Sequence, residues 1–497
     1  MTREEEIIKE RLKKIDELRK LKINPYAYSF EKKNNSAELQ EKYKKIKSEE
    51  KTKDKAIVAG RVLSMRLMGK INFASLQDEK GKIQIIVEEG TAGKKLVDFF
   101  SKYIDSGDFI GVEGNVMRTK RGELSVDAEK IEILTKAILP LPEKWHGLQD
   151  AEERFRKRYL DLIMNQDLKD LFFKKAKFWQ TIRNFLLERG FLEVETPVLE
   201  TSAGGAAATP FKTHHNALDA DVYLRISMGE LWQKRLMVGG YEKTFEIGRQ
   251  FRNEGMDMEH LQDYTQMEFY WAYADYKDGM KIVEEMYKKI AKEVLGTMQF
   301  KTHGYEIDLG KKWETYDYAD LIKKETKIDI FQAKESEIKK VLDKLNLEYD
   351  KTMDKWRLVD RLWKYCRKSL TGPGFLVNQP VQLSPLAKRS RENDKVVEQF
   401  QVIIAGTEMG NGYSELNDPL DQEERFKEQA KLKAMGDVEA QEHDTDFVEA
   451  LKYGMPPVCG FGVSERLFAY LVDKPIRECV FFPLMKKEEK TVDSKKK

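Results

Sequence analysis

Apolar residues change their spacing along the chain, and the change predicts two kinds of structure in the N-terminal third. Within residues 1–50, Ile8, Leu12 and Ile15 recur four and three positions apart, which predicts helix. From about residue 55 to 134, apolar and polar positions alternate and glycines interrupt the pattern. Several short strands at roughly ten-residue spacing favour a small β-barrel.

The remainder of the chain alternates between helical and extended patterns. A proline-rich stretch, 139–142, separates it from the predicted barrel and is typical of a linker. Helical periodicity covers 151–189, 275–295 and the lysine-rich segment 318–370, and strands are expected at 223–226, 244–254, 264–271 and 402–416. This mixture predicts an α+β fold in which a barrel precedes a larger mixed domain.

Two of the expected strands, 244–254 and 264–271, have one apolar and one polar face. The apolar faces hold Phe245, Ile247, Phe251, Met267, Phe269 and Trp271, and the polar faces hold Glu246, Gln250, Arg252, Glu254, Tyr264, Gln266, Glu268 and Tyr270. If the strands are antiparallel neighbours, the two polar rows lie side by side. Such a surface is either solvated or the floor of a pocket, and the tyrosines among the charges favour a pocket.

Two later segments repeat this polar pattern. Asn411, Tyr413 and Glu415 are in phase on one strand, whereas Glu408 is out of phase and would need an irregularity to share their face, which Gly410 allows. The glycine-spaced stretch 459–466 runs into helical spacing and places Arg466 at a strand-to-helix junction. An arginine there opposes the helix dipole, so the residue is either an anion contact or a surface arginine.

Composition narrows the classes of protein. The 497 residues include 88 basic and 86 acidic side chains, a net charge of +2, so no overall charge excess points to a polyanionic partner, although a local basic face could still bind one. No apolar run approaches 18 residues and no apolar leader begins the chain, so we expect a cytoplasmic protein without a membrane span. Three cysteines without a Cys-x-x-Cys pair, no His-x-x-x-His pair and no P-loop exclude a disulfide framework, a zinc ribbon and Walker-type nucleotide binding.

In combination, the segments resemble the class II lysyl-tRNA synthetases over about residues 1–486. Residues 190–197 resemble motif 1, the dimer-interface element; residues 245–268 resemble motif 2; and residues 460–466 resemble motif 3. The stretches 146–150, 213–219 and 410–418 are close to the wording of this subfamily. Each motif is moderately specific, and their order over the whole chain is highly specific.

The resemblance implies a domain organisation. A helical segment (1–54) precedes an OB-fold anticodon-binding domain (55–138) and a linker (139–150). The catalytic domain (151–486), an antiparallel sheet flanked by helices, is followed by a charged flexible tail (487–497). Motif 1 implies a homodimer.

The activity implied is ATP-dependent ligation of L-lysine to tRNA(Lys) through a lysyl-adenylate, with release of pyrophosphate and AMP. The implied catalytic residues are Arg252 and Arg466. The implied ATP contacts are Arg252, Glu254, His260, Tyr264, Glu408 and Arg466. The implied lysine contacts are Gly204, Glu230, Arg252, Glu268, Tyr270, Asn411, Tyr413 and Glu415. A lysine ammonium is costly to bury unpaired, which explains the carboxylate at position 415.

The chain departs from the family in ways that concern the metal and the nucleotide. Relatives place two acidic Mg²⁺ ligands in this region; Glu408 matches one, but Gln401 stands at the other position and offers only a neutral oxygen. Tyr264 takes a place usually held by phenylalanine, and Ser227-Met228-Gly229-Glu230 also differs from the usual wording. The segment 318–370 has no function that its sequence indicates.

The barrel has candidate RNA contacts. Phe73 alternates with the inward-facing residues of its strand, so we expect it on the outer face, where an unpaired base can stack on it. Gln84 is likewise placed to read a base edge, and the resemblance puts Arg66 and Glu123 nearby. A basic residue found beside this site in relatives is Met65 here.

Other functions remain open. An aspartyl- or asparaginyl-type class II synthetase shares the barrel and motif 2, but its pocket would complement a shorter, uncharged or acidic side chain, unlike Glu415 beside Tyr270. A catalytically weakened RNA-binding paralogue is favoured only by Gln401 and opposed by Arg252, Glu254 and Arg466. A synthetase-like modifier of protein lysines normally lacks the barrel.

Overall fold

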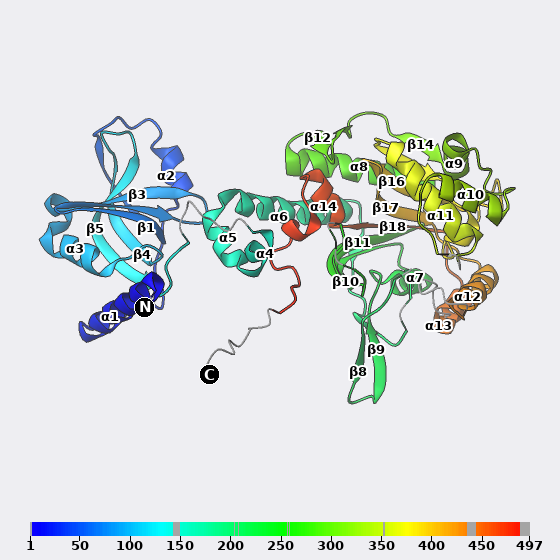
Figure 1. Cartoon of the computed structure of the whole chain (residues 1–497), viewed down its shortest axis with the longest axis horizontal. Helices are drawn as coiled ribbons and strands as arrows, with labels where there is room; N and C mark the ends of the chain where they lie inside the picture. Colours follow the sequence, from blue (N-terminus) through cyan, green and yellow to red (C-terminus); the bar gives the residue numbers. More distant parts are fainter. Residues whose placement is uncertain are drawn as a thin grey trace, which may run out of the picture. The chain divides into compact units, whose positions relative to one another are not determined.

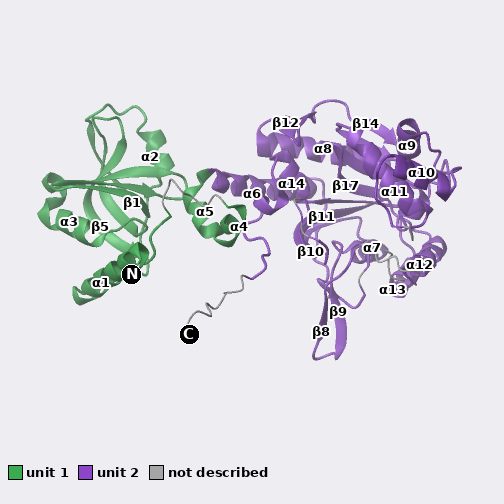
Figure 2. Ribbon diagram, in the orientation of Figure 1, with its two compact units in different colours: residues 1–166 green, residues 167–497 purple. Residues whose placement is uncertain are grey.

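The computed structural model describes residues 2–142, 150–202, 204–206, 208–255, 257, 259–350, 353–434 and 444–487. Among these residues, none of the helices is both long and apolar enough to cross a membrane. The chain forms two compact units, residues 1–166 and 167–497, and each is described by itself (Figure 2). The residues 146–149 that resemble the subfamily, part of the expected linker and nearly all of the expected tail lie outside the described residues.

The first unit contains the expected barrel. Its strands, β1 (Lys51–Met68), β2 (Ile71–Gln77), β3 (Lys82–Glu88), β4 (Phe109–Arg118) and β5 (Leu124–Thr135), close in the order β1-β2-β3-β5-β4 (Figure 1). Inward-facing Val58, Ile85, Ile110 and Val126 are fully buried, as the alternation predicts. An amphipathic helix, α3 (Glu89–Tyr103), lies between β3 and β4 and was not expected from the sequence.

The prediction of helix throughout residues 1–50 is wrong in its extent. Two helices form, α1 (Arg3–Lys20) and α2 (Ser36–Lys42), each with an N-terminal capping box. Between them Tyr26 bridges to Thr135 of β5, because Asn24-Pro25 ends the helical pattern. Two further short helices, α4 (Ala151–Arg156) and α5 (Arg158–Met164), complete this unit.

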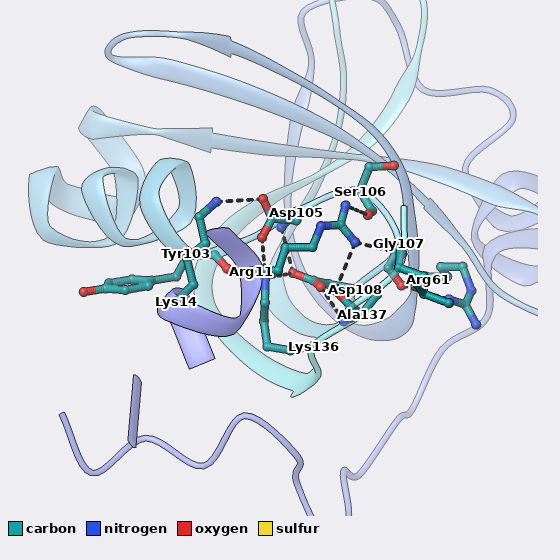
Figure 3. Close-up of polar contacts among 11 residues, drawn as sticks. Arg11, Lys14, Arg61, Tyr103, Asp105, Ser106, Gly107, Asp108, Lys136 and Ala137 are labelled. Carbon is teal, nitrogen blue, oxygen red and sulfur yellow. Dashed lines mark hydrogen bonds and ion pairs between the residues drawn. The ribbon is translucent and has the colours of Figure 1, made fainter. Parts of the chain in front are cut away.

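A buried ion cluster fixes α1 to the barrel (Figure 3). The Lys136 ammonium lies 2.6 Å from Asp105 and 2.5 Å from Asp108, and it donates to the Tyr103 carbonyl at 2.7 Å. From α1, Lys14 pairs with the other Asp105 oxygen at 2.7 Å, and Arg11 donates to three backbone carbonyls. Each of the two carboxylates therefore has an ammonium partner, while the Arg11 guanidinium is paired with backbone carbonyls.

The second unit is built on an eight-stranded sheet of order β14-β15-β16-β17-β18-β11-β10-β6. The strands are β6 (Leu192–Glu193), β10 (Lys243–Phe251), β11 (Asp263–Ala272), β14 (Glu314–Asp317), β15 (Gly374–Val377), β16 (Gln399–Ile404), β17 (Thr407–Ser414) and β18 (Val458–Ser464). All neighbours are antiparallel except β14 with β15 and β10 with β6. Smaller sheets pair β7 (Leu199–Glu200), β9 (Ala220–Leu224) and β8 (Lys212–His215), and β12 (Gln299–Thr302) with β13 (Tyr305–Asp308).

Helices cover the sheet on one face and frame a cavity on the other. On the apolar face, Phe269 and Phe400 each pack 5.7 Å from Phe461, measured between ring centroids, beneath α8 (Tyr276–Leu295). The remaining helices are α6 (Gln166–Leu187), α7 (Glu230–Val238), α9 (Tyr318–Thr326), α10 (Glu335–Lys344), α11 (Lys355–Cys366), α12 (Pro419–Ala434), α13 (Thr445–Lys452) and α14 (Arg466–Leu471). Helices α9, α10 and α11 share one hydrophobic core next to β14 (Figure 1).

Candidate functional site

The polar face of the large sheet is the floor of a cavity of about 550 Å³. Register explains the floor: β10 and β11 pair so that Gln250 lies opposite Tyr264, and Glu268 lies opposite Gly462 of β18. Gly460 and Gly462 keep the floor open, since a Cβ on Gly460 would lie 2.0 Å from the Glu415 Oε1 atom. The interpretation of the polar rows as a pocket floor, rather than solvated surface, is confirmed for Tyr264, Gln266, Glu268 and Tyr270. Glu246 instead pairs with Arg225, and Gln250 donates to Gln266.

Most of the residues singled out from the sequence line this one cavity. They are Glu230, Arg252, Glu254, His260, Tyr264, Glu268, Tyr270, Gln401, Glu408, Asn411, Tyr413, Glu415 and Arg466. Of the lysine and ATP contacts that the resemblance implies, Gly204 does not line the cavity; its neighbour Gly205 does, and the Gly204 carbonyl accepts a hydrogen bond from Ser227 at 3.3 Å.

The strands differ from the expectation after Phe251 and agree with it near Glu408. The strand expected at 244–254 ends at Phe251. The Arg252 N–H still donates to the Gln262 carbonyl, but the next backbone N–H, that of Asn253, donates to the Thr209 carbonyl outside the sheet. Arg252 and Glu254 therefore lie on the connection beyond β10. The irregularity that Glu408 required is present, since the β16–β17 register shifts between Gln401 and Ile403.

Three carboxylates, Glu230, Glu268 and Glu415, form the acidic end of the cavity. Each is at least 92% buried, and the Tyr413 hydroxyl donates to Glu230 while the Tyr270 hydroxyl donates to Glu268 at 3.0 Å. The Met228 N–H and the Gln266 amide also donate to Glu268, at 3.1 and 2.7 Å. The acidic end is thus a deep pocket of carboxylates supported by phenols and amides.

A lysine that the sequence analysis missed lies among these carboxylates. The fully buried Lys234 ammonium lies 2.9 Å from Glu230 Oε1 and 2.5 Å from Glu415 Oε2, and 5.6 Å from the Tyr413 ring centroid. Its only local signal is the Glu230–Lys234 spacing of four on a helix, which is common on solvated helical faces as well. One ammonium faces three carboxylates, so the acidic end has a surplus of acid groups.

Burial and this surplus shift the protonation of the acidic end. Burial raises the pKa of Glu415 to about 8; Lys234 opposes the rise, and the other two carboxylates add to it. Burial and Glu230 likewise raise the pKa of Glu268 to about 7. Burial alone would lower the pKa of Lys234, but the facing carboxylates of Glu230 and Glu415 outweigh it and raise that pKa. The pocket therefore favours an additional cation, which would stabilise the ionised carboxylates.

The opposite end of the cavity is rich in arginine. The Arg252 guanidinium lies 5.8 Å from the Tyr264 ring centroid, and Arg252 Nε donates to the Ile226 carbonyl at 3.3 Å. Arg466, at the start of α14, donates to the Glu408 carbonyl and lies 3.8 Å from Glu259. Glu254 and His260 are exposed at the rim, and His260 Nδ1 lies 2.8 Å from Asp257. Two guanidiniums beside an aromatic ring can hold an anionic, planar ligand.

Glu408 and Gln401 offer few oxygens to a metal. Glu408 Oε1 accepts from Trp363 and Arg367, both at 2.8 Å, whereas the buried Gln401 Oε1 has no hydrogen-bond partner among the described residues. Over the described ranges, no cluster of three His, Cys, Asp or Glu side chains could hold a metal ion. The pair can therefore complete the shell of a Mg²⁺ ion that brings other ligands with it, as a phosphate-bound ion does.

In the first unit, the candidate RNA contacts share one face of the barrel. Arg66 lies opposite Phe73 on neighbouring strands, and Phe73 is only partly buried. Gln84 accepts a hydrogen bond from Ser125 at 2.9 Å, and exposed Glu123 lies two residues before that serine. The expected outward position of Phe73 is confirmed.

Both units match known families. Residues 150–486 match the family described as tRNA synthetases class II (D, K and N), and residues 56–134 match the family described as OB-fold nucleic acid binding domain. A class II synthetase domain that follows an OB-fold is the class of protein that this fold and cavity define.

Curated relatives narrow the class. The protein called lysine–tRNA ligase of Thermotoga maritima is 43% identical over 484 residues, which cover 97% of this chain and 96% of that protein. Proteins of the same name from Moorella thermoacetica and Thermosipho africanus are 42% and 41% identical over 490 and 484 residues. The chain belongs to the lysine–tRNA ligase family of the class II tRNA synthetases.

Proposed function

We propose that the chain ligates L-lysine to tRNA(Lys) at the expense of ATP. The observation that supports this best is the acidic end, where three buried carboxylates face a single resident ammonium, Lys234, within the same cavity as Arg252 and Arg466. Lysine carries two ammonium groups, the α-ammonium and the side-chain ammonium, and these supply the two missing positive charges. Its carboxylate can then lie toward the arginines.

The lysine contacts divide between the two ammonium groups. Glu415, with Tyr270 and Asn411 beside it, receives the side-chain ammonium, and Tyr413 forms the wall along the methylene groups. Glu230, Glu268 and the backbone at Gly204 receive the α-ammonium. Lys234 holds Glu230 and Glu415 in place between these two groups.

The nucleotide contacts lie at the arginine end. Tyr264 stacks on the adenine, Glu254 reads its edge, and Arg466, His260 and Arg252 hold the phosphates. The lysine carboxylate oxygen attacks the α-phosphorus and pyrophosphate leaves; Arg252 stabilises the charge that develops on the phosphoryl oxygens. A ribose hydroxyl of the tRNA end then attacks the lysyl carbonyl carbon, and AMP leaves with the bonding electrons.

Mg²⁺ is the metal that we propose for this reaction. Bound to the ATP phosphates, it supplies charge neutralisation of the pyrophosphate leaving group. Glu408 and Gln401 are the residues of this chain that would hold it.

The barrel face with Arg66, Phe73, Gln84 and Glu123 is our proposed anticodon site, within an anticodon domain at 55–138 that precedes a catalytic domain at 151–486. Replacing Phe73 with alanine should weaken tRNA binding by about 1–3 kcal/mol, because a stacked base loses its partner. Lysine activation without tRNA should not change. An unaltered KM for tRNA would exclude Phe73 from this site.

We also propose a homodimer formed through the motif 1 region, in the cytoplasm where translation takes place. Exposed apolar side chains of this region are Leu187 of α6, Leu192 of β6, Leu199 of β7 and Val198 just before β7, and β6 is the edge of the large sheet. Sedimentation of the full chain as a monomer at micromolar concentration would contradict this.

The test of the main proposal is amino-acid-dependent ATP–pyrophosphate exchange with all twenty amino acids. We expect lysine to give the strongest exchange by a wide margin. Because the matched family includes aspartate and asparagine enzymes, strongest exchange with either of those would replace the proposal. No exchange with any amino acid, rescued by Gln401→Glu, would indicate a weakened paralogue.

A further inference from the structure

Helix α11 meets the cavity at both of its ends. At its N-terminal end, Trp356 and Arg357 line the cavity. At its C-terminal end, Trp363 Nε1 and Arg367 Nη1 both donate to Glu408 Oε1 at 2.8 Å. The sequence indicated no function for the segment 318–370. Two of its side chains, Trp363 and Arg367, thus hydrogen-bond to Glu408, which is one of the two proposed metal-binding residues.

The charges around Glu408 do not match a protein-built metal site. Arg367 is its ion-pair partner, with side-chain exposures of 22% for Arg367 and 27% for Glu408. The second oxygen donor of the pair, Gln401, is neutral, and within the described part of the chain its buried oxygen accepts no hydrogen bond. Glu408, Gln401 and Arg367 together are therefore neutral, whereas two acids without an arginine would carry two negative charges. Divalent-ion affinity depends strongly on that ligand charge.

We infer that Arg367 stands in for a metal ion at Glu408. Its guanidinium neutralises the carboxylate and, with Trp363, positions it, so this chain has no nucleotide-independent metal site and takes up a divalent ion only together with the ATP phosphates. Arg367 is a positioning residue that acts through Glu408. The inference rests on the proposed function only in that the cavity binds ATP.

A purely structural role for Arg367 predicts something different. In that case its guanidinium only holds the α9–α11 segment against β17, and its loss would lower stability without altering affinity for metals. Metal binding without nucleotide separates the two possibilities, and it requires neither an amino acid nor turnover.

The experiment is a Mn²⁺ titration of the full chain, followed by the electron paramagnetic resonance signal of the free ion. It is run without nucleotide and with a non-hydrolysable ATP analogue. Wild-type chain should retain no Mn²⁺ at submillimolar concentration without nucleotide and should retain it with the analogue. Arg367→Gln and Gln401→Glu should each raise the nucleotide-free affinity on the order of 10–100-fold. Trp363→Phe, which removes only the indole donor, should have a smaller effect.

Controls and contrary outcomes are defined by the same titration. Arg154→Gln removes another arginine–carboxylate pair of similar arginine exposure, that with Asp161 in α4 and α5, and should leave Mn²⁺ binding unchanged. If Arg367→Gln fails to fold, Gln401→Glu alone decides, because it keeps the ion pair. Tight nucleotide-free binding by the wild type, or no gain in a folded variant, would overturn the inference. Lysine-dependent exchange could still hold in that case, so the two proposals fail separately.

Discussion

Each unit buries a lysine between two carboxylates, and only one of these clusters is suited to bind a ligand. Lys136 lies between Asp105 and Asp108, with Lys14 and a backbone carbonyl completing the cluster (Figure 3). Lys234 lies between Glu230 and Glu415, but a third carboxylate, Glu268, adjoins them and the group lines a cavity. The first cluster is balanced in that each carboxylate has an ammonium partner, whereas the second has two more carboxylates than ammonium groups and lines a cavity. A buried ion pair by itself therefore indicates a structural role. An excess of buried charge of one sign next to a cavity indicates a binding site for a ligand of the opposite charge.

The largest effect that we expect is on the balanced cluster. Replacing Lys136 with methionine leaves Asp108 buried without its cation, which should lower the free energy of unfolding by about 3–5 kcal/mol. Denaturant unfolding of the full chain, followed at a signal of the first unit, measures it. Lysine-dependent exchange should persist at denaturant concentrations below the unfolding transition. Loss of lysine activation in the folded variant would contradict a purely structural role for Lys136.

Replacing Glu415 with glutamine tests the unbalanced cluster. The substitution removes the proposed partner of the substrate's side-chain ammonium and should cost about 2–5 kcal/mol of binding, seen as a rise in the KM for lysine in the exchange assay. The KM for ATP should hardly change, and unfolding should be affected much less than by the Lys136 substitution. If the KM for lysine stays at its wild-type value, the acidic end is not the lysine site.

The Lys234→Met variant sharpens the comparison through its pH dependence. Lys234 is the main group that opposes the effect of burial on Glu415, so without it the pKa of that carboxyl should rise above about 8. The midpoint in a plot of kcat/KM for lysine against pH should move upward with it. A lysine that only packs the core would lower stability and leave this midpoint in place; Lys234→Arg should restore it in part.

Wild-type lysine binding should itself depend on pH. The raised pKa values of Glu268, about 7, and Glu415, about 8, mean that a proton must leave before a substrate ammonium can pair with the carboxylate. The kcat/KM for lysine should rise between pH 6 and 8, by at most about tenfold per unit for one proton, and then level off.

The stability of the free protein should show the opposite trend. Above the ordinary glutamate pKa of 4.5, the folded state keeps these two protons while the unfolded state releases them. Both groups therefore lower the free energy of unfolding as pH rises from about 4.5 to 8. If the kcat/KM for lysine does not change over that pH range, both carboxyls are already ionised at its lower end.

Alternation and glycine spacing predicted much of the cavity, because both act locally. The faces of β10 and β11, the irregular register near Glu408 and the position of Arg466 all follow from strand and helix periodicity. The barrel followed from the same pattern, whereas α3 was missed because its segment continues from a strand into a glycine-containing helix.

Long-range pairs could not be predicted in this way. Lys234 and Arg367 are two among 88 basic residues, and nothing near them in the sequence shows that their partners, Glu415 and Glu408, come from another part of the chain. Lys136 was missed for the same reason. Such pairs are created by tertiary packing, so single-sequence periodicity contains no signal for them.

Gly460 of β18 sets the space available in the acidic end of the cavity through its lack of a side chain. At that position a single added carbon would lie 2.0 Å from the Glu415 Oε1 atom, so the missing side chain leaves space beside the carboxylate that we propose for the lysine ammonium. Gly460→Ala should therefore shift preference toward ornithine, which is one methylene shorter than lysine, in side-by-side exchange assays. The length of the amino acid that is preferred could therefore be changed by one methylene through a single substitution at this glycine.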